Sequence, residues 1–210
     1  ILFYRQQLHI YKGMLYRTIR FRDAAGRVTA VNERRIVHMA QPHLAALEIE
    51  VTPENWSGEL EIVSALDGRV LNDGVSRYRG LSNRHLEPLE AGHFSADAVF
   101  LTVQTTQSKL RIAQAARTRL FKGGEHLPDT PSVTQEPGYI AGSISVSVSE
   151  GEQIRIEKTV SMYTSRDHGI SECALEAKKA VQRAGGFEEL SKDHFTAWEH
   201  LWRRFVIDAH

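Results

Sequence analysis

Apolar and polar residues alternate with a period of two along most of the first 165 residues. The clearest stretches are 15–21, 44–51, 60–66 and 99–105. This period places successive side chains on opposite faces of a pleated strand, so each stretch is predicted to be a β-strand with one face in a core. Loops rich in Gly, Asn, Asp and Pro, such as 23–26 and 72–74, separate them. We therefore expect an antiparallel structure of about ten strands in two sheets packed face to face.

Short polar connectors predict which strands are neighbours. Two hairpins are expected, one formed by 99–105 with 110–117 and one formed by 144–148 with 154–160. Two arms, 68–97 and 121–140, lack a clear period and are expected to be irregular. Irregular surface loops of this length are often functional.

The period changes to that of a helix after about residue 168. One apolar stripe is followed by Gly185-Gly186, which is typical of a helix end. A second, heavier stripe follows the glycines. The first stripe is Ile170, Ala174, Ala177, Val181 and Ala184; the second is Phe187, Leu190, His194, Trp198, Leu201 and Phe205, widened by Phe195 and Trp202. The prediction is a mainly β fold: a large antiparallel two-sheet β-sandwich over 1–166, followed by two linker α-helices over 167–210.

Charge and cysteine content exclude several classes of protein. The 210 residues carry 26 basic and 26 acidic side chains, so no net charge favours nucleic acid or an anionic membrane. With one cysteine no intrachain disulfide can form, and neither a leader nor a membrane-length apolar run is present. We expect a cytoplasmic protein without nucleic-acid or membrane partners. The chain starts without Met inside a strand pattern and stops after Phe205-Val-Ile, so we expect a piece of a longer protein.

One polar cluster raises the question of chemistry. The stretch GLSNRHLEPLEAGHF, residues 80–94, holds two histidines, two glutamates and Arg84 between glycines and a proline. A metal site, an acid/base pair, a sugar-binding loop and an ordinary polar loop are the alternatives. Zinc requires three or four convergent ligands at defined spacing. His85, Glu87 and His93 show no such spacing, so no metal is expected and a polar loop is favoured over a metal site.

Five longer segments identify a relationship. HMAQPHLAALEIEVTPENWSGELEIVSALDG, GLSNRHLEPLE, TTQSKLRIAQAARTRL, KTVSMYTSRD and HFTAWEHLWRRFVID occur in this order over nearly the whole chain. Together they resemble the N-terminal domain of glycoside hydrolase family 65, the family of maltose, trehalose and kojibiose phosphorylases and related α-glucoside hydrolases. Members of that family combine a large antiparallel β-sandwich, a helical linker, an (α/α)6 barrel and a small C-terminal sheet. The resemblance implies that this chain is the sandwich and linker, which agrees with the periodicity.

The resemblance also decides how the polar residues are interpreted. Cleavage of a glycoside needs a protonated carboxylic acid and a nucleophile on the opposite face, which makes Glu87 and Glu90 tempting candidates. The resemblance places the acid in the barrel, so no catalytic residue is expected here. It leaves Asn83, Arg84, His85 and Glu87 as candidates for the substrate rim or the domain interface. An internal ion pair of Arg84 with Glu87 or Glu90 is an equal alternative.

What the resemblance implies about function concerns the longer protein. Its reaction would be inverting cleavage of an α-linked glucose disaccharide, with inorganic phosphate as co-substrate in a phosphorylase and no cofactor. The expected partners are the protein's own C-terminal (α/α)6 domain and the disaccharide, and a homodimer stays open. Trp198 and Trp202, spaced i and i+4, are expected to dock the linker helix. The alternative is a free-standing carbohydrate-binding β-sandwich module, and neither the disaccharide nor the choice of phosphate or water follows from these residues.

Overall fold

The computed structural model describes residues 1–72, 83–128 and 131–205. Strands occupy most of the chain up to residue 164, and two helices follow. The strands are β1 (Phe3–His9), β2 (Met14–Arg22), β3 (Val28–Val37), β4 (Leu44–Pro53), β5 (Gly58–Asp67), β6 (Leu86–Ser95), β7 (Ala98–Thr105), β8 (Arg111–Lys122), β9 (Glu125–Leu127), β10 (Ser132–Glu136), β11 (Tyr139–Val148) and β12 (Ile154–Thr164). A 3-10 turn, η1 (Ile10–Lys12), joins β1 to β2, and the helices are α1 (Cys173–Arg183) and α2 (Phe187–Trp202). None of the helices in the described ranges is long and apolar enough to cross a bilayer.

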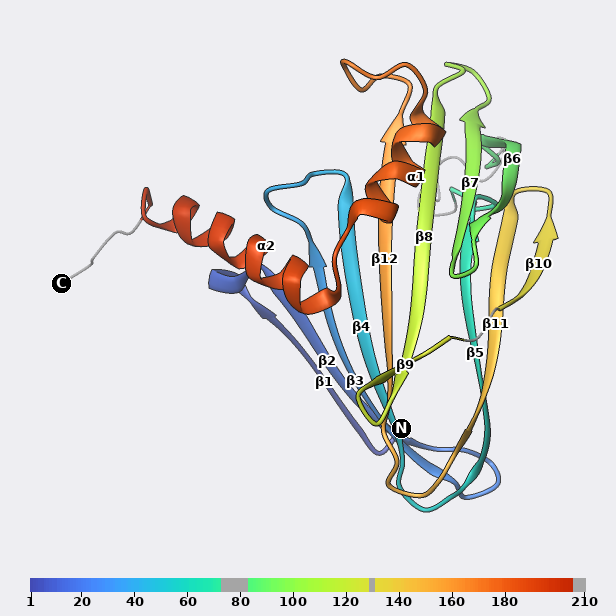
Figure 1. Cartoon of the computed structure of the whole chain (residues 1–210), viewed down its shortest axis with the longest axis vertical. Coiled ribbons are helices and arrows are strands. Elements are labelled where there is room, and N and C mark those ends of the chain that lie inside the picture. Colours follow the sequence, from blue (N-terminus) through green and yellow to red (C-terminus); the bar gives the residue numbers. More distant parts are fainter. Residues whose placement is uncertain (73–82, 129–130, 206–210) are drawn as a thin grey trace.

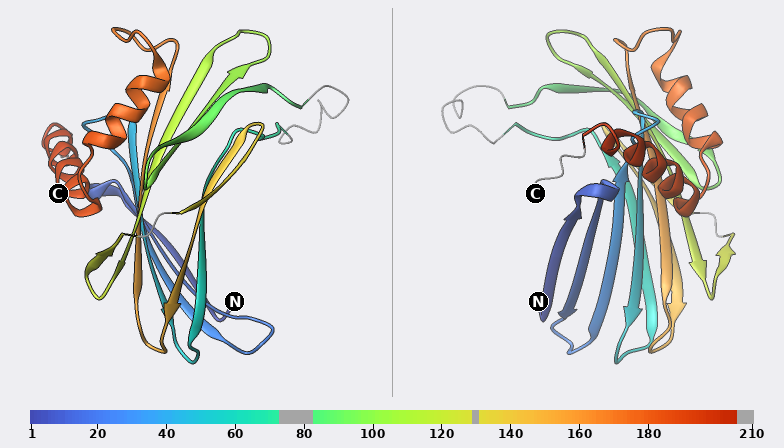
Figure 2. Two further views of the ribbon diagram at one scale, coloured as in Figure 1. Left: turned by 45° about the vertical axis from the view of Figure 1, so that its right-hand side comes forward. Right: turned by 90° about the vertical axis from the view of Figure 1, so that its left-hand side faces the viewer.

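The strands form two antiparallel sheets of unequal size (Figure 1). The larger sheet has nine strands in the order β1-β2-β3-β4-β12-β8-β7-β6, with β9 paired to β8. The smaller sheet has three strands in the order β10-β11-β5. Both helices lie on the outer face of the larger sheet, away from the smaller one (Figure 2). The predicted mainly β, two-sheet architecture with two following helices is confirmed.

One of the two predicted hairpins is wrong. β7 and β8 pair as expected, but β11 pairs with β10 and β5 while β12 pairs with β4 and β8. The loop between β11 and β12 therefore crosses from one sheet to the other. An arch of this kind and a hairpin have the same alternation, because in both cases the apolar side of each strand faces the core. Val148 and Ile154, on either side of the loop, are both buried in the same cluster between the sheets.

The arm 68–97, predicted to be irregular, contains a strand. Residues 86–95 form β6, the edge of the larger sheet, and part of the other arm forms β9 and β10. Pro88 and Gly92 obscured the period, and the pairing of β6 with β7 shifts register at Pro88/Glu90 and at His93/Ser95. Proline and bulges of this kind are typical of edge strands.

The core between the sheets consists of two apolar clusters. One is at the end where the sheets are joined by the β11–β12 loop, and the other lies beneath β7 and β11. Trp56 packs against the first cluster, and its indole Nε1 donates to Thr29 Oγ1 at 3.0 Å. The clusters are Leu120, Ile144, Val146, Val148, Ile154 and Ile156, and Leu66, Leu101, Val103, Ala116 and Ile140.

Polar contacts satisfy both ends of helix α1, and the contact at its C-terminal end ties the helix to the larger sheet. The Glu172 side chain precedes the helix and accepts from the backbone N–H groups of Ala174 and Leu175. At the other end the buried Arg117 of β8 donates to three backbone carbonyls, of Val181 at 2.9 Å and of Ala184 and Gly185 at 2.8 Å. The middle of the predicted stripe, Ala174 to Val181, is buried against the sheet.

Helix α2 begins on the same face and leaves it. Its first backbone N–H, of Phe187, donates to Glu157 Oε2 of β12 at 3.1 Å, where a carboxylate is favoured by the helix dipole. Phe187 and Leu190 are buried in a cluster with Met14, Ile36, Leu44 and Ala46. The C-terminal half then projects past the sheet (Figure 1).

Candidate functional site

The predicted rim residues lie where the chain enters β6. Glu87 is on β6 itself and accepts from Lys109 Nζ at 3.0 Å and from Gln104 Nε2 at 3.2 Å. The hydrogen bond from Lys109, followed by that from Gln104, lowers the pKa of Glu87 below its usual value. A general acid needs the opposite shift. The environment of Glu87 therefore opposes the acid role that its sequence position suggested.

The internal ion pair of Arg84 with Glu87 or Glu90 is not formed. Glu87 pairs with Lys109 instead, because the β7–β8 turn brings that lysine beside it. Arg84 and His85 are exposed, and Arg84 makes no ion pair within the described parts of the chain. Asn83 is half-buried and has an interaction partner. Residues 80–82 of the cluster lie outside the described residues.

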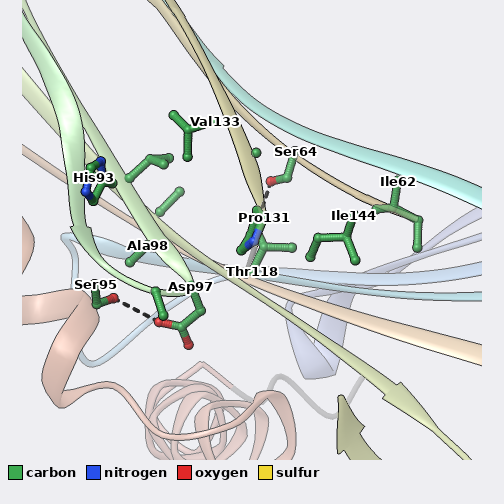
Figure 3. Close-up of a pocket in the computed structure, with 14 residues that line it drawn as sticks. Ile62, Ser64, His93, Ser95, Asp97, Ala98, Thr118, Pro131, Val133 and Ile144 are labelled. Carbon is green, nitrogen blue, oxygen red and sulfur yellow. Dashed lines mark hydrogen bonds between the residues drawn. The ribbon is translucent and has the colours of Figure 1, made fainter. Parts of the chain in front are cut away.

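A shallow cleft lies between the sheets near the β6–β7 turn (Figure 3). Its polar groups pair with one another: Ser95 Oγ donates to Asp97 Oδ1 at 2.9 Å, and the hydroxyls of Ser64 and Thr118 are 2.7 Å apart. Burial acts to raise the pKa of Asp97, but hydrogen bonds from Arg119 and Ser95 outweigh it and leave this pKa lowered. The cavity volume of about 20 Å³ holds a water molecule rather than a sugar.

No set of three or more His, Cys, Asp or Glu side chains in the described ranges is arranged to hold a metal ion. His85 and His93, which the sequence placed near each other, are both exposed. Most of strand β6 lies between them, so they cannot bind one metal ion together.

The two tryptophans of α2 pack on the turn between β1 and β2. The Trp202 ring lies 5.1 Å from that of Tyr11 and 6.0 Å from that of Trp198, measured between centroids. Trp198 covers Gly13, whose φ of +57° suits glycine. Both indole N–H groups are buried and have no acceptor among the described residues. The tryptophans thus fill the contact between the helix and the β1–β2 turn.

A histidine pair beneath α2 was not predicted as a unit. His194 is fully buried; its Nδ1 accepts from the Met39 N–H at 3.0 Å, and Nε2 faces the carbonyls of Lys12 and Gly13 at 2.9 and 3.1 Å. This arrangement selects the neutral tautomer with the proton on Nε2. His38 lies edge-on to it, with ring centroids 5.9 Å apart. The sequence signal was the position of His194 in the apolar stripe.

The stripe on α2 is buried only along its first half. Phe187, Leu190 and His194 are 1%, 3% and 0% exposed, whereas Phe195 and Phe205 are 41% and 63% exposed. A helix normally buries its whole apolar stripe. Phe195 in the middle of α2 and Phe205 beyond its end therefore present apolar surface that the described part of the domain does not cover.

His38 should make stability depend on pH. Burial, and then the electrostatic effect of the neighbouring His194 ring, lower the pKa of His38, while Asp193 opposes the shift. The unfolded chain takes up a proton near about pH 6.5, which the folded state resists. The free energy of unfolding should therefore fall as the pH drops below this value.

The measurement is the urea midpoint at about pH 7.5 and about pH 5.5, for the wild type and for His38→Asn. Asparagine keeps an acceptor for the Ala40 and Gln41 N–H groups that His38 Nδ1 now accepts. The variant should lose less stability on acidification than the wild type. Equal losses would show that His38 is not responsible.

Comparison with known proteins gives the family. The model of the glycosyl hydrolase family 65 N-terminal domain matches residues 1–201. The chain belongs to glycoside hydrolase family 65. An uncharacterised glycosyl hydrolase of Mycobacterium tuberculosis (strain H37Rv) is 38% identical to this family 65 domain over 208 residues, 99% of the chain and 16% of that protein. Kojibiose phosphorylase of Halothermothrix orenii is 28% identical over 218 residues, 99% of the chain and 27% of that enzyme.

A solved structure of the same fold comes from the human microbiome. It is assigned as a kojibiose phosphorylase, and it matches 95% of the family 65 domain with a TM-score of 0.75 and 14% sequence identity. The match covers 25% of that chain. The family 65 domain therefore spans between about a sixth and about a quarter of the proteins that it resembles.

Proposed function

We propose that this domain is the non-catalytic N-terminal part of an inverting α-glucoside phosphorylase or hydrolase that acts on α-linked glucose disaccharides. The half-exposed stripe of α2 is the observation that carries the proposal. Phe195, in the middle of α2, and Phe205, three residues beyond its last residue, are apolar and exposed. A further body of protein packed at this place would cover them, and the (α/α)6 catalytic barrel of the longer enzyme would supply it.

The chemistry of the described residues favours a structural role for this domain over a catalytic one. Inverting cleavage needs a carboxylic acid with a raised pKa on one side of the sugar, and water or phosphate on the other. Glu87 and Asp97 have lowered pKa values, and the cleft beside Asp97 is too small for a sugar ring. The acid, and the site for water or inorganic phosphate, would belong to the barrel, in a cytoplasmic enzyme that needs no cofactor.

Asn83, Arg84, His85 and Glu87 would contribute to the pocket rim or to the contact with the barrel. Arg84 and His85 are exposed just before β6, which is one edge strand of the larger sheet; β1 is the other edge strand. A guanidinium offers planar paired donors to a carboxylate or to sugar hydroxyls. Trp198 and Trp202 would hold the linker helix against the β1–β2 turn while the barrel docks beyond it. A homodimer remains a prediction.

Turnover of the domain alone tests the proposal. Residues 1–210 and the longer protein should be assayed with α-linked glucose disaccharides, with and without inorganic phosphate, for released glucose and glucose 1-phosphate. We expect turnover by the longer protein and none by residues 1–210. Release by residues 1–210 would contradict the proposal. Glycan affinity of an inactive 1–210 domain, together with an inactive longer protein, would favour a carbohydrate-binding module instead.

A further inference from the structure

The smaller sheet covers only part of the larger one. Contacts between the sheets join β10, β11 and β5 to β6, β7 and β8. The inner face of the larger sheet is the face opposite the helices, and its exposure rises away from those contacts. Ile154 on β12 is fully buried, Met162 at the other end of β12 is 46% exposed, and Val37 on β3 is 73% exposed. In the right-hand view of Figure 2, β1, β2 and β3 lie to one side of the smaller sheet.

Strand β5 has a free edge at the boundary of this uncovered region. It pairs with β11 on one side, and no other described strand pairs with it. Gly68 N–H bonds to Gly138 O, so in an antiparallel ladder the odd-numbered residues of β5 direct their N–H and C=O groups away from β11. The carbonyl of Ala65 confirms this direction, because Lys158 Nζ of β12 donates to it at 2.8 Å. The free edge of β5 therefore faces the side of β12 and β4.

Lys158 lies beside the edge of β5 that has no neighbouring strand among the described residues. Its ammonium group lies between the two apolar clusters of the core, on the same side of β12 as Ile154 and Ile156. Burial lowers the pKa of Lys158. A lysine at the edge of a sheet occupies carbonyls that another strand would otherwise take. Here it satisfies one carbonyl of a ten-residue edge.

The uncovered face also contains a buried ion cluster. Glu33 of β3 is 3% exposed and pairs with both Arg17 and Arg35 on that face. Arg17 Nε is buried and has no acceptor within the described residues. Buried donors normally have an acceptor. The cluster therefore places charged groups, and one donor unpartnered within the described chain, on the face that the smaller sheet leaves open.

We propose that a further β-strand, from a part of the same longer polypeptide outside residues 1–210, pairs with the free edge of β5 and extends the smaller sheet over the inner face of β12, β4 and β3. Its inward side chains are apolar towards Leu47 and Val31. The relatives extend far beyond the region that this chain matches, so such a segment has a source. The proposal does not depend on the reaction that the enzyme catalyses.

A second copy of this chain fits the edge less well. Glu59, Glu61 and Asp67 project from β5, and all three are exposed. Two β5 edges paired antiparallel about Val63 would place Glu59 of one copy opposite Asp67 of the other. Like charges directly opposite each other destabilise a sheet. A strand of different sequence avoids this repulsion.

Hydrogen exchange of the longer protein tests the proposal. An edge strand protects about half of its amides, whereas a strand with two neighbours protects nearly all of them. We expect peptides spanning 58–67 to be protected from exchange at nearly all amides, as peptides of β7 and β8 are. Protection of only the even-numbered half of β5 would overturn the proposal. If residues 1–210 alone show the same full protection, and only when they form a dimer, the edge of β5 pairs with a second copy of the chain. That result would also overturn the proposal.

A pair of substitutions in the longer protein gives an independent check. Val63→Pro removes an N–H that points to the free edge and leaves the ladder with β11 intact, whereas Val63→Thr keeps the N–H. Exchange in β3 and β4 should rise about tenfold or more in Val63→Pro and remain unchanged in Val63→Thr. Equal exchange in the two variants would contradict a strand at this edge.

Discussion

Replacing Gly13 by valine should lower the free energy of unfolding by about 4 kcal/mol. Part of this loss arises because a β-branched residue is strained in the left-handed region, and the rest arises from overpacking. Gly13 has φ of +57°, and a Cβ atom built there would lie 1.9 Å from Trp198 Nε1. The indole cannot stay in place beside that atom. Helix α2 would lose its contact with the β1–β2 turn.

The matched control is Gly123→Val. Gly123 has nearly the same backbone conformation, with φ of +59°, and a Cβ atom added there would meet nothing within 4 Å. This variant should lose only the backbone contribution, about 1–2 kcal/mol. Chemical denaturation gives both values, and tryptophan emission should shift to longer wavelength in Gly13→Val. Equal destabilisation of the two variants would mean that the Trp198 contact contributes nothing.

Replacing Arg117 by methionine should lower the free energy of unfolding by about 3 kcal/mol. The guanidinium satisfies three carbonyls at the end of α1 and the start of the α1–α2 connection. Burial lowers the pKa of Arg117, which reflects the cost of placing the charge there. Methionine preserves much of the side-chain volume but leaves those carbonyls without their donor.

Arg119→Met is the control for this change. Arg119 lies two residues further along β8 and forms a partly exposed ion pair with Asp97 at 2.9 Å. Exposed pairs contribute at most about 1 kcal/mol. Urea titration should therefore separate the two variants by about 2 kcal/mol. A loss in Arg119→Met as large as that in Arg117→Met would show that the α1 carbonyls are not the cause.

The strands could be predicted where one face is covered and the other is not. Residues 44–51 form part of β4 and residues 15–21 form part of β2. Residues 99–105 of β7 are instead covered on both faces, because Phe100 packs against α1 and Leu101 packs between the sheets. The sheet that each strand joins could not be predicted, because an arch and a hairpin bury the same alternate residues. Strand β6 was missed because an edge strand tolerates Pro88 and two register shifts that hide its period.

The polar contacts that position the helices depend on residues far apart in sequence. Glu157 is 30 residues from the Phe187 N–H that it accepts, and Arg117 is 64 residues from Val181. The pattern on α2 was sufficient to place His194 in the apolar stripe, but its three backbone partners became clear only from the fold. The same holds for Glu87, whose partner Lys109 is brought close by the β7–β8 turn.

The position of β12 in the larger sheet affects how the domain is made on the ribosome. Its Ile154 pairs with Val51 of β4, so the second neighbour of β4 is synthesised about a hundred residues after β4 itself. At about 5–20 residues per second, this delay is about 5–20 s. During that time strand β4 forms the unpaired edge of the β1–β4 meander, and its free backbone groups can pair with other nascent chains. Early chaperone binding to residues 44–53 would therefore protect the domain until β12 emerges.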